Sequence, residues 1–159
     1  MPNVTSDKLE QVIDAGGQSG VVQEIGVFAT ILATVDNRKV IVPNSAITGG
    51  SIVNATAHPT RRVDLNFPIA PDEDVERAKA VALRTATGEA KVLKDPKPEV
   101  VAVALADGLN IRLMAWVATG DLLEMQARLF ERVREAFGKE GVRPPIPVRE
   151  IRMINPKGP

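Results

Sequence analysis

Cysteine and tyrosine are absent from the 159 residues, and histidine and tryptophan each occur once. Without cysteine the chain has no disulfide and no thiolate metal site, and one histidine cannot build a multi-histidine site. That histidine, His58, precedes a proline in a predicted loop, and no G-x-S-x-G nucleophile elbow occurs. No nucleophile, base and orienting group can be combined from the sequence, so we expect no enzyme, cofactor or metal.

Net charge and long apolar runs are missing too. Twenty basic and twenty acidic residues cancel, so we expect no nucleic-acid partner. No apolar run approaches the roughly 18 to 20 residues that span a bilayer, and residues 1–10 lack the features of a signal peptide. We therefore expect a soluble, intracellular type of chain, either complete or cut from a longer protein.

The stretch from Gly20 to Ile47 contains the densest strand signals. Valine and threonine dominate it, and Gly26, Asp36-Asn37 and Pro43-Asn44 interrupt it, which predicts three short strands. Further short strands are predicted near residues 8–14 and 52–56. Closely spaced strands of this kind favour a small barrel or sandwich.

A glycine-rich segment, residues 15–20, separates the first two of these strands. Its Gly16, Gly17 and Gly20 fit neither the dinucleotide-binding fingerprint nor a P-loop. We interpret the whole segment as a turn, because glycine adopts turn conformations at little cost.

Another pattern begins at Arg61. Apolar residues alternate over 63–69, which predicts a strand, and a helix follows to about Thr87 with Gly88 as its stop. The acids at 72–74 are interpreted as the start of this helix, with Asp72 as N-cap, in preference to a cation site. Residues 99–105 and 109–117 are predicted to be strands joined by a hairpin at Asp107-Gly108.

A second helix is predicted from Asp121, which forms an apparent capping box with Glu124, to Gly138. A proline corner at 144–147 then precedes a last strand at 148–154. We therefore expect an α+β chain: a small Sm-like or SH3-like β barrel at 1–60, a ferredoxin-like α/β sandwich at 61–143, and a terminal segment at 144–159. The last strand closes either its own sheet or a neighbour's.

Several residues are candidates for subunit contacts. Trp116 shares a strand face with Met114 and Arg112, so either a helix of this chain or another protein covers it. Arg61 and Arg62 either pair with acids of a neighbour or form a solvated edge. The remaining candidates are Phe28, Pro43, Asn44, Ile151 and Met153.

The opening stretch resembles the small-conductance mechanosensitive channel (MscS-like) family. The residues that carry the resemblance are Gly20, Val22, Ile25, Gly26, Phe28, Thr30, Thr34, Asp36, Asn37, Val40, Val42, Pro43, Asn44, Ser45 and Ile47, followed by Asn54, Arg61 and Arg62. Gly120-Asp121 and the proline corner resemble the carboxy-terminal domain of the family. The resemblance covers roughly residues 6–154.

The resemblance implies a cytoplasmic cage of a channel in a prokaryotic inner membrane. In the family the β domain lies below the pore helix, subunits assemble as a heptamer, and their last strands pair in a parallel barrel. The channel opens under membrane tension and releases ions and osmolytes on hypoosmotic shock. The family's membrane helices and its Phe-x-x-Gly-Asp motif are not found here, so we interpret the chain as a soluble portion that contacts the membrane only through helices it lacks.

Another function class stays open at this point. Small barrels and ferredoxin-like units also occur as stand-alone modules that bind RNA or small ligands. Stacking of RNA bases requires exposed aromatic rings on a basic sheet, and this chain has few such rings. An oligomer-forming channel domain is therefore the leading hypothesis.

Overall fold

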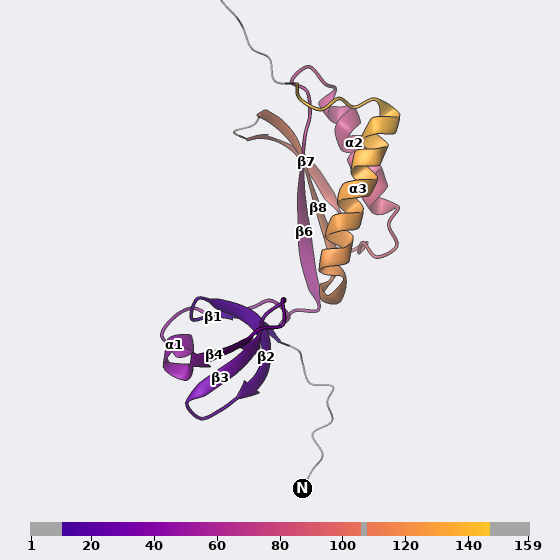
Figure 1. Cartoon of the computed structure of the whole chain (residues 1–159). Helices are drawn as coiled ribbons and strands as arrows, with labels where there is room; N and C mark the ends of the chain where they lie inside the picture. Colours follow the sequence, from indigo (N-terminus) through magenta and orange to yellow (C-terminus); the bar gives the residue numbers. More distant parts are fainter. Residues whose placement is uncertain (1–10, 106–107, 147–159) are drawn as a thin grey trace, which may run out of the picture. The chain divides into compact units, whose positions relative to one another are not determined.

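The computed structural model describes residues 11–105 and 108–146. Contacts between residues divide the chain into two units, which we call unit 1 (residues 1–59) and unit 2 (residues 60–159) (Figure 1). Each unit has its own hydrophobic core.

Unit 1 is a five-stranded antiparallel sheet in the order β4-β3-β2-β1-β5, with one short helix. Its elements are β1 (Val12–Ala15), β2 (Gln18–Ile25), β3 (Ala29–Ala33), β4 (Lys39–Pro43), α1 (Asn44–Thr48) and β5 (Val53–Asn54). The core consists of Ile13, Ala15, Leu32, Val42 and Ile47. Helix α1 was not expected from the sequence, and its Ile47 completes this core.

The turn between β1 and β2 is tighter than the sequence analysis predicts. Only Gly16 and Gly17 turn the chain, with φ values of +58° and +75° that favour glycine. Gly20 lies inside β2 instead, opposite Ile13. A Cβ on Gly20 would stand 2.6 Å from the carbonyl oxygen of Ala33, so glycine is required there for the close approach of β2 and β3.

Unit 2 is a three-stranded antiparallel sheet in the order β6-β8-β7 with two long helices on one face (Figure 1). Its elements are β6 (Thr60–Pro68), α2 (Val75–Thr87), β7 (Glu99–Leu105), β8 (Gly108–Ala118), the 3₁₀ turn η1 (Thr119–Asp121) and α3 (Leu122–Glu140). The α+β fold class is thus confirmed. Asp107 and the predicted last strand lie outside the described residues.

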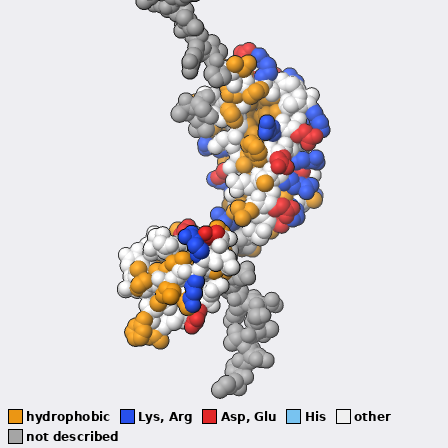
Figure 2. Space-filling model, in the orientation of Figure 1, with side chains coloured by type: hydrophobic (Ala, Val, Ile, Leu, Met, Phe, Trp, Pro, Cys, Tyr) orange, Lys and Arg blue, Asp and Glu red, His pale blue; other side chains and the backbone are white. Residues whose placement is uncertain are grey.

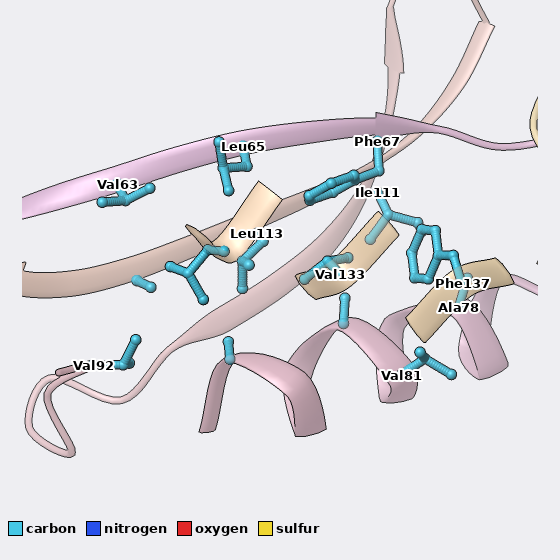
Figure 3. Close-up of a cluster of buried hydrophobic side chains, with 14 of the residues drawn as sticks. Val63, Leu65, Phe67, Ala78, Val81, Val92, Ile111, Leu113, Val133 and Phe137 are labelled. Carbon is cyan, nitrogen blue, oxygen red and sulfur yellow. The ribbon is translucent and has the colours of Figure 1, made fainter. Parts of the chain in front are cut away.

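Strict alternation along β6 and β8 builds the core of unit 2. Val63, Leu65 and Phe67 project from β6 toward the helices, where they meet residues of β8 and α3 (Figure 3). On β8 the buried hydrophobic residues are Ile111, Leu113, Ala115 and Val117, as the period-two pattern predicts, and the polar Asn110 is buried as well. One face of the sheet is therefore covered by α2 and α3.

The N-cap of helix α2 lies two residues after the predicted one. The N-cap is Asp74, whose Oδ1 accepts hydrogen bonds from the backbone N–H groups of Glu76 at 3.0 Å and Arg77 at 3.1 Å. Asp72 was the wrong choice because its carboxylate instead accepts from the guanidinium of Arg143 at 2.9 Å. The helix ends at Gly88 as expected.

Helix α3 begins directly after Asp121 as expected, but the predicted capping box and the predicted end need correction. Asp121 makes no capping hydrogen bond, and instead Asp121 and Glu124 both accept from Lys91 Nζ, at 2.9 and 2.7 Å. The helix continues through Gly138 to Glu140, because the left-handed residue that stops it is Gly141, with φ +71°.

Candidate interaction surfaces

The last residue of β2 and the loop to β3 form an exposed hydrophobic end of unit 1, which we call the apolar tip (residues 25–28). Ile25, Val27 and Phe28 are 75%, 86% and 87% exposed. Figure 2 shows hydrophobic side chains gathered where this loop lies in Figure 1. Exposed apolar side chains that cluster in this way mark an interaction site.

Asn44, the first residue of α1, fastens this tip. Its Nδ2 donates to the carbonyl oxygens of Gly26 at 3.0 Å and Val27 at 3.1 Å, and its backbone N–H donates to the carbonyl oxygen of Phe28 at 2.9 Å. Its Oδ1 accepts from the buried Thr30 hydroxyl at 2.9 Å. The tip is thereby held in one conformation, which lowers the entropy cost of binding.

The structure thus brings three candidate residues of unit 1 together. Pro43 pairs with Ala29 on the neighbouring strand. Asn44 comes next in the sequence and hydrogen-bonds to Phe28, the last residue of the tip. Phe28 is exposed, whereas Asn44 and the pairing of Pro43 with Ala29 set the geometry of the loop.

Unit 2 has an uncovered sheet face, which we call the Trp116 face. Because α2 and α3 pack on the other side, no described element of this unit covers it. The residues on this face are Arg62, Asp64 and Asn66 of β6, Arg112, Met114 and Trp116 of β8, and Glu99 and Val101 of β7. It includes three of the predicted candidates.

Hydrogen bonds order the polar rows of the Trp116 face. Arg62 lies directly opposite Trp116, and its guanidinium binds both carboxylate oxygens of Asp64 at 2.8 and 3.0 Å. This hydrogen-bonded carboxylate raises the pKa of Arg62. Further along the same face, Asn66 lies opposite Arg112, and Arg112 Nε donates to Asn66 Oδ1 at 2.9 Å. The acid that pairs with Arg62 is therefore on its own strand.

Other candidates are separated from this face. Arg61 lies opposite Val117 and so projects to the other side of the sheet from Arg62. Ile151 and Met153 lie outside the described residues. Within the described residues, no group of acidic or histidine side chains could hold a metal ion.

Two charged clusters of unit 2 were not found from the sequence. Arg143 binds Asp72 and Glu73, and it anchors the segment after α3 to the start of α2. Glu89, whose side chain is 7% exposed, accepts from Arg128 at 2.7 Å and Arg132 at 3.1 Å. Both clusters join residues that are 39 to 71 positions apart, so no local pattern could reveal them.

None of the helices in the described ranges is long and apolar enough to cross a membrane. The curated relatives include the small-conductance mechanosensitive channel of Edwardsiella ictaluri, 30% identical over 147 residues, which cover 90% of this chain and 50% of that protein. An uncharacterized MscS family protein of Synechocystis is 27% identical over 146 residues, 91% of this chain and 49% of that protein. The chain spans about half the length of these relatives.

Among solved structures, the closed-state MscS of Helicobacter pylori has a similar fold, with a TM-score of 0.83 at 20% identity. The alignment covers 97% of this chain and 62% of that one. Residues 8–57 match the family described as the β-domain of mechanosensitive ion channels, and residues 63–143 match the one described as the C-terminal domain of the mechanosensitive ion channel MscS. With a match in each of its two units, the chain belongs to the MscS family of mechanosensitive ion channels.

Proposed function

We propose that this chain forms the cytoplasmic vestibule of a mechanosensitive channel that releases ions and osmolytes on hypoosmotic shock. The observation that carries the proposal is the family match in both units together with their two uncovered surfaces, the apolar tip and the Trp116 face. The chain contributes structure and assembly, and pore formation requires membrane helices at its amino-terminal side. The parent channel is placed in the inner membrane of a prokaryote.

The apolar tip supports a role as the docking point for those helices. Its three large side chains are exposed on a loop that Asn44 holds in place. A partner that covers them gains about 25 cal/mol for each Å² of apolar surface removed from water, without ordering the loop first. We infer that an apolar helix segment of the same channel covers the tip.

The Trp116 face supports assembly of the vestibule from several copies. Tryptophan, methionine and arginine are enriched in protein interfaces, and all three occur side by side on β8. We infer a cyclic homo-oligomer, a heptamer by family resemblance, whose last strands pair between subunits around residues 148–154. Within this assembly Arg62, Arg112 and Trp116 lie between subunits.

A chimeric channel tests the proposed function. The membrane half of the Edwardsiella ictaluri channel is joined to residues 8–154 of this chain and expressed in bacteria that lack their own mechanosensitive channels. We expect survival of hypoosmotic shock and tension-gated currents in patch-clamp recordings. A variant with Phe28→Asp in the tip should assemble but conduct poorly.

Blue-native electrophoresis of the membranes makes a negative result decisive. An assembled chimera that neither conducts nor protects cells would contradict the release of osmolytes. A chimera that reaches the membrane only as single subunits would contradict the vestibule itself. The unmodified channel of the relative serves as the positive control.

A further inference from the structure

Helix α3 has a second apolar side that the core of unit 2 does not use. Leu123, Ala127, Phe130 and Arg134 follow one another at spacings of three or four residues, so they share one side of the helix. Leu123 is 78% and Phe130 42% exposed, whereas Leu129 on the core side is fully buried. We call these four residues the α3 strip.

The strip borders two hollows that meet at Phe130. One, of about 310 Å³, is lined by Leu65, Leu123 and Ala127 among others, and the second, of about 390 Å³, by Phe67, Phe137 and Arg134 among others. Phe130 stacks on Phe67 with ring centroids 5.6 Å apart, which fixes its ring at the surface. The strip is therefore a rigid aromatic anchor between two hollows.

The charges at the strip and at the Trp116 face are complementary. Arg134 has no ion-pair or hydrogen-bond partner among the described residues. Glu99 on the Trp116 face makes no hydrogen bond or close ion pair there either, although its charge helps to raise the pKa of Arg62. Both side chains are on exposed residues. Each surface thus presents a hydrophobic centre, with the Arg134 cation beside one centre and the Glu99 carboxylate beside the other.

The spacings of the two surfaces also agree. Along α3, Phe130 and Arg134 are separated by one helical turn, about 5–6 Å between their Cβ atoms. On the sheet, Glu99 lies directly opposite Met114, about 5 Å across the strands, and Trp116 follows on the same face. A ring placed on Met114 and Trp116 therefore brings the helical cation within reach of Glu99.

We propose that the α3 strip of one copy docks on the Trp116 face of the next copy. This inference rests on the proposed assembly and names its two mating surfaces. The two surfaces differ, so each copy uses its α3 strip to bind one neighbour and its Trp116 face to bind the other. Such a contact is heterologous. Such contacts close into a ring at a suitable angle, and they do not produce a two-fold dimer.

Cross-linking tests this pairing. Because the sequence has no cysteine, only the introduced cysteines can react. The variant Glu99→Cys/Arg134→Cys, treated with a short bis-maleimide, should give a ladder of covalent oligomers on a denaturing gel. Each single variant should remain monomeric on the gel, because the strip of one copy does not contact the strip of another, and the faces do not contact each other either. The control Leu83→Cys/Glu99→Cys should give no ladder, since Leu83 is exposed on α2 and belongs to neither surface.

Mixing two interface variants provides the second test. Leu123→Glu/Arg134→Glu disables only the strip, and Glu99→Arg/Trp116→Ala disables only the face. Each alone should keep the circular dichroism of the wild type and associate more weakly than the wild type in sedimentation. An equimolar mixture, which restores one intact junction per pair of copies, should associate more strongly than either variant alone. Leu83→Glu, a matched change at an exposed leucine, should leave the oligomer unchanged.

Two kinds of negative result distinguish a failure of the named pairing from a failure of the proposed assembly. If the wild type assembles while the strip and face variants assemble equally well, or if single-cysteine variants cross-link to themselves, the named pairing is wrong and the vestibule stands. A different protein or a small acidic ligand on the strip would give this result too. If the wild type stays monomeric at every concentration, the proposed assembly fails together with the pairing.

Discussion

Asn44 and Val27 are 17 residues apart in sequence, yet the side-chain amide of Asn44 donates to the carbonyl oxygen of Val27 at 3.1 Å. The same nitrogen reaches Gly26 at 3.0 Å. The first residue of α1 thus determines the shape of a loop that begins two strands earlier. This contact explains how an apolar tip can be both exposed and ordered.

Replacing Asn44 should loosen the tip. Asn44→Ala removes two hydrogen bonds to loop carbonyls and the bond from Thr30, and we expect unit 1 to lose about 1–3 kcal/mol. Hydrogen exchange of the amides in β2 and β3 measures this loss. Ser45→Ala, one residue further in the same helix, should change stability by less than about 0.5 kcal/mol. Equal effects of the two changes would refute the role of the side chain.

The contact between β2 and β3 should not tolerate a methyl group at position 20. In Gly20→Ala the new Cβ would stand 2.6 Å from the carbonyl oxygen of Ala33, so we expect unit 1 to lose about 1–3 kcal/mol. Gly50→Ala is the control, because a Cβ there meets nothing within 4 Å. Urea unfolding followed by circular dichroism compares them, and a Gly20 variant as stable as the control would contradict the packing.

The anchor at Arg143 should make unit 2 sensitive to acid. Hydrogen bonds from the Arg143 side chain hold the pKa of Asp72 below its usual 3.8, and those from its backbone and side chain hold the pKa of Glu73 below 4.5. Because both pKa values are depressed in the folded state, the stabilisation is present above the unfolded pKa values and is lost as pH falls through the folded ones.

Arg143→Gln tests this linkage. The variant should have a lower Tm than the wild type near about pH 7, and the difference should shrink progressively below about pH 4. Trp116 fluorescence reports the unfolding of unit 2, because it is the only tryptophan in the chain. A Tm difference that stays constant down to about pH 2 would show that Arg143 acts through packing alone.

The two arginines around Glu89 should behave non-additively. Either guanidinium alone can pair with this buried carboxylate, so Arg128→Ala and Arg132→Ala should each cost less than about 1 kcal/mol. The double variant leaves a buried charge uncompensated and should cost about 3 kcal/mol. Urea unfolding of the four proteins completes the cycle, and strictly additive losses would contradict a shared acceptor.

Regular patterns made much of the fold predictable. The alternation along β8 correctly separates Leu113 from Met114 and Trp116, because side chains of a strand point alternately to opposite faces. Gly88 marks the end of α2 for a similarly local reason. These features depend only on residues within a few positions of one another.

Long-range contacts decided the features that the sequence did not predict. Asp72 and Asp74 are both suitable N-caps, and only the docking of Arg143 on Asp72 leaves the cap to Asp74. Leu123 has the type and the neighbourhood of a core residue, but the direction in which α3 packs leaves it 78% exposed. The α3 strip therefore became visible only in the folded unit.

Native mass spectrometry is the sharpest test of whether this chain assembles into the ring of a channel vestibule. We expect one closed oligomer larger than a dimer, with a mass that is an integer multiple of 17.1 kDa and stays the same as concentration rises. A monomer at every concentration, a two-fold dimer, or an open series of masses that grows with concentration would contradict it.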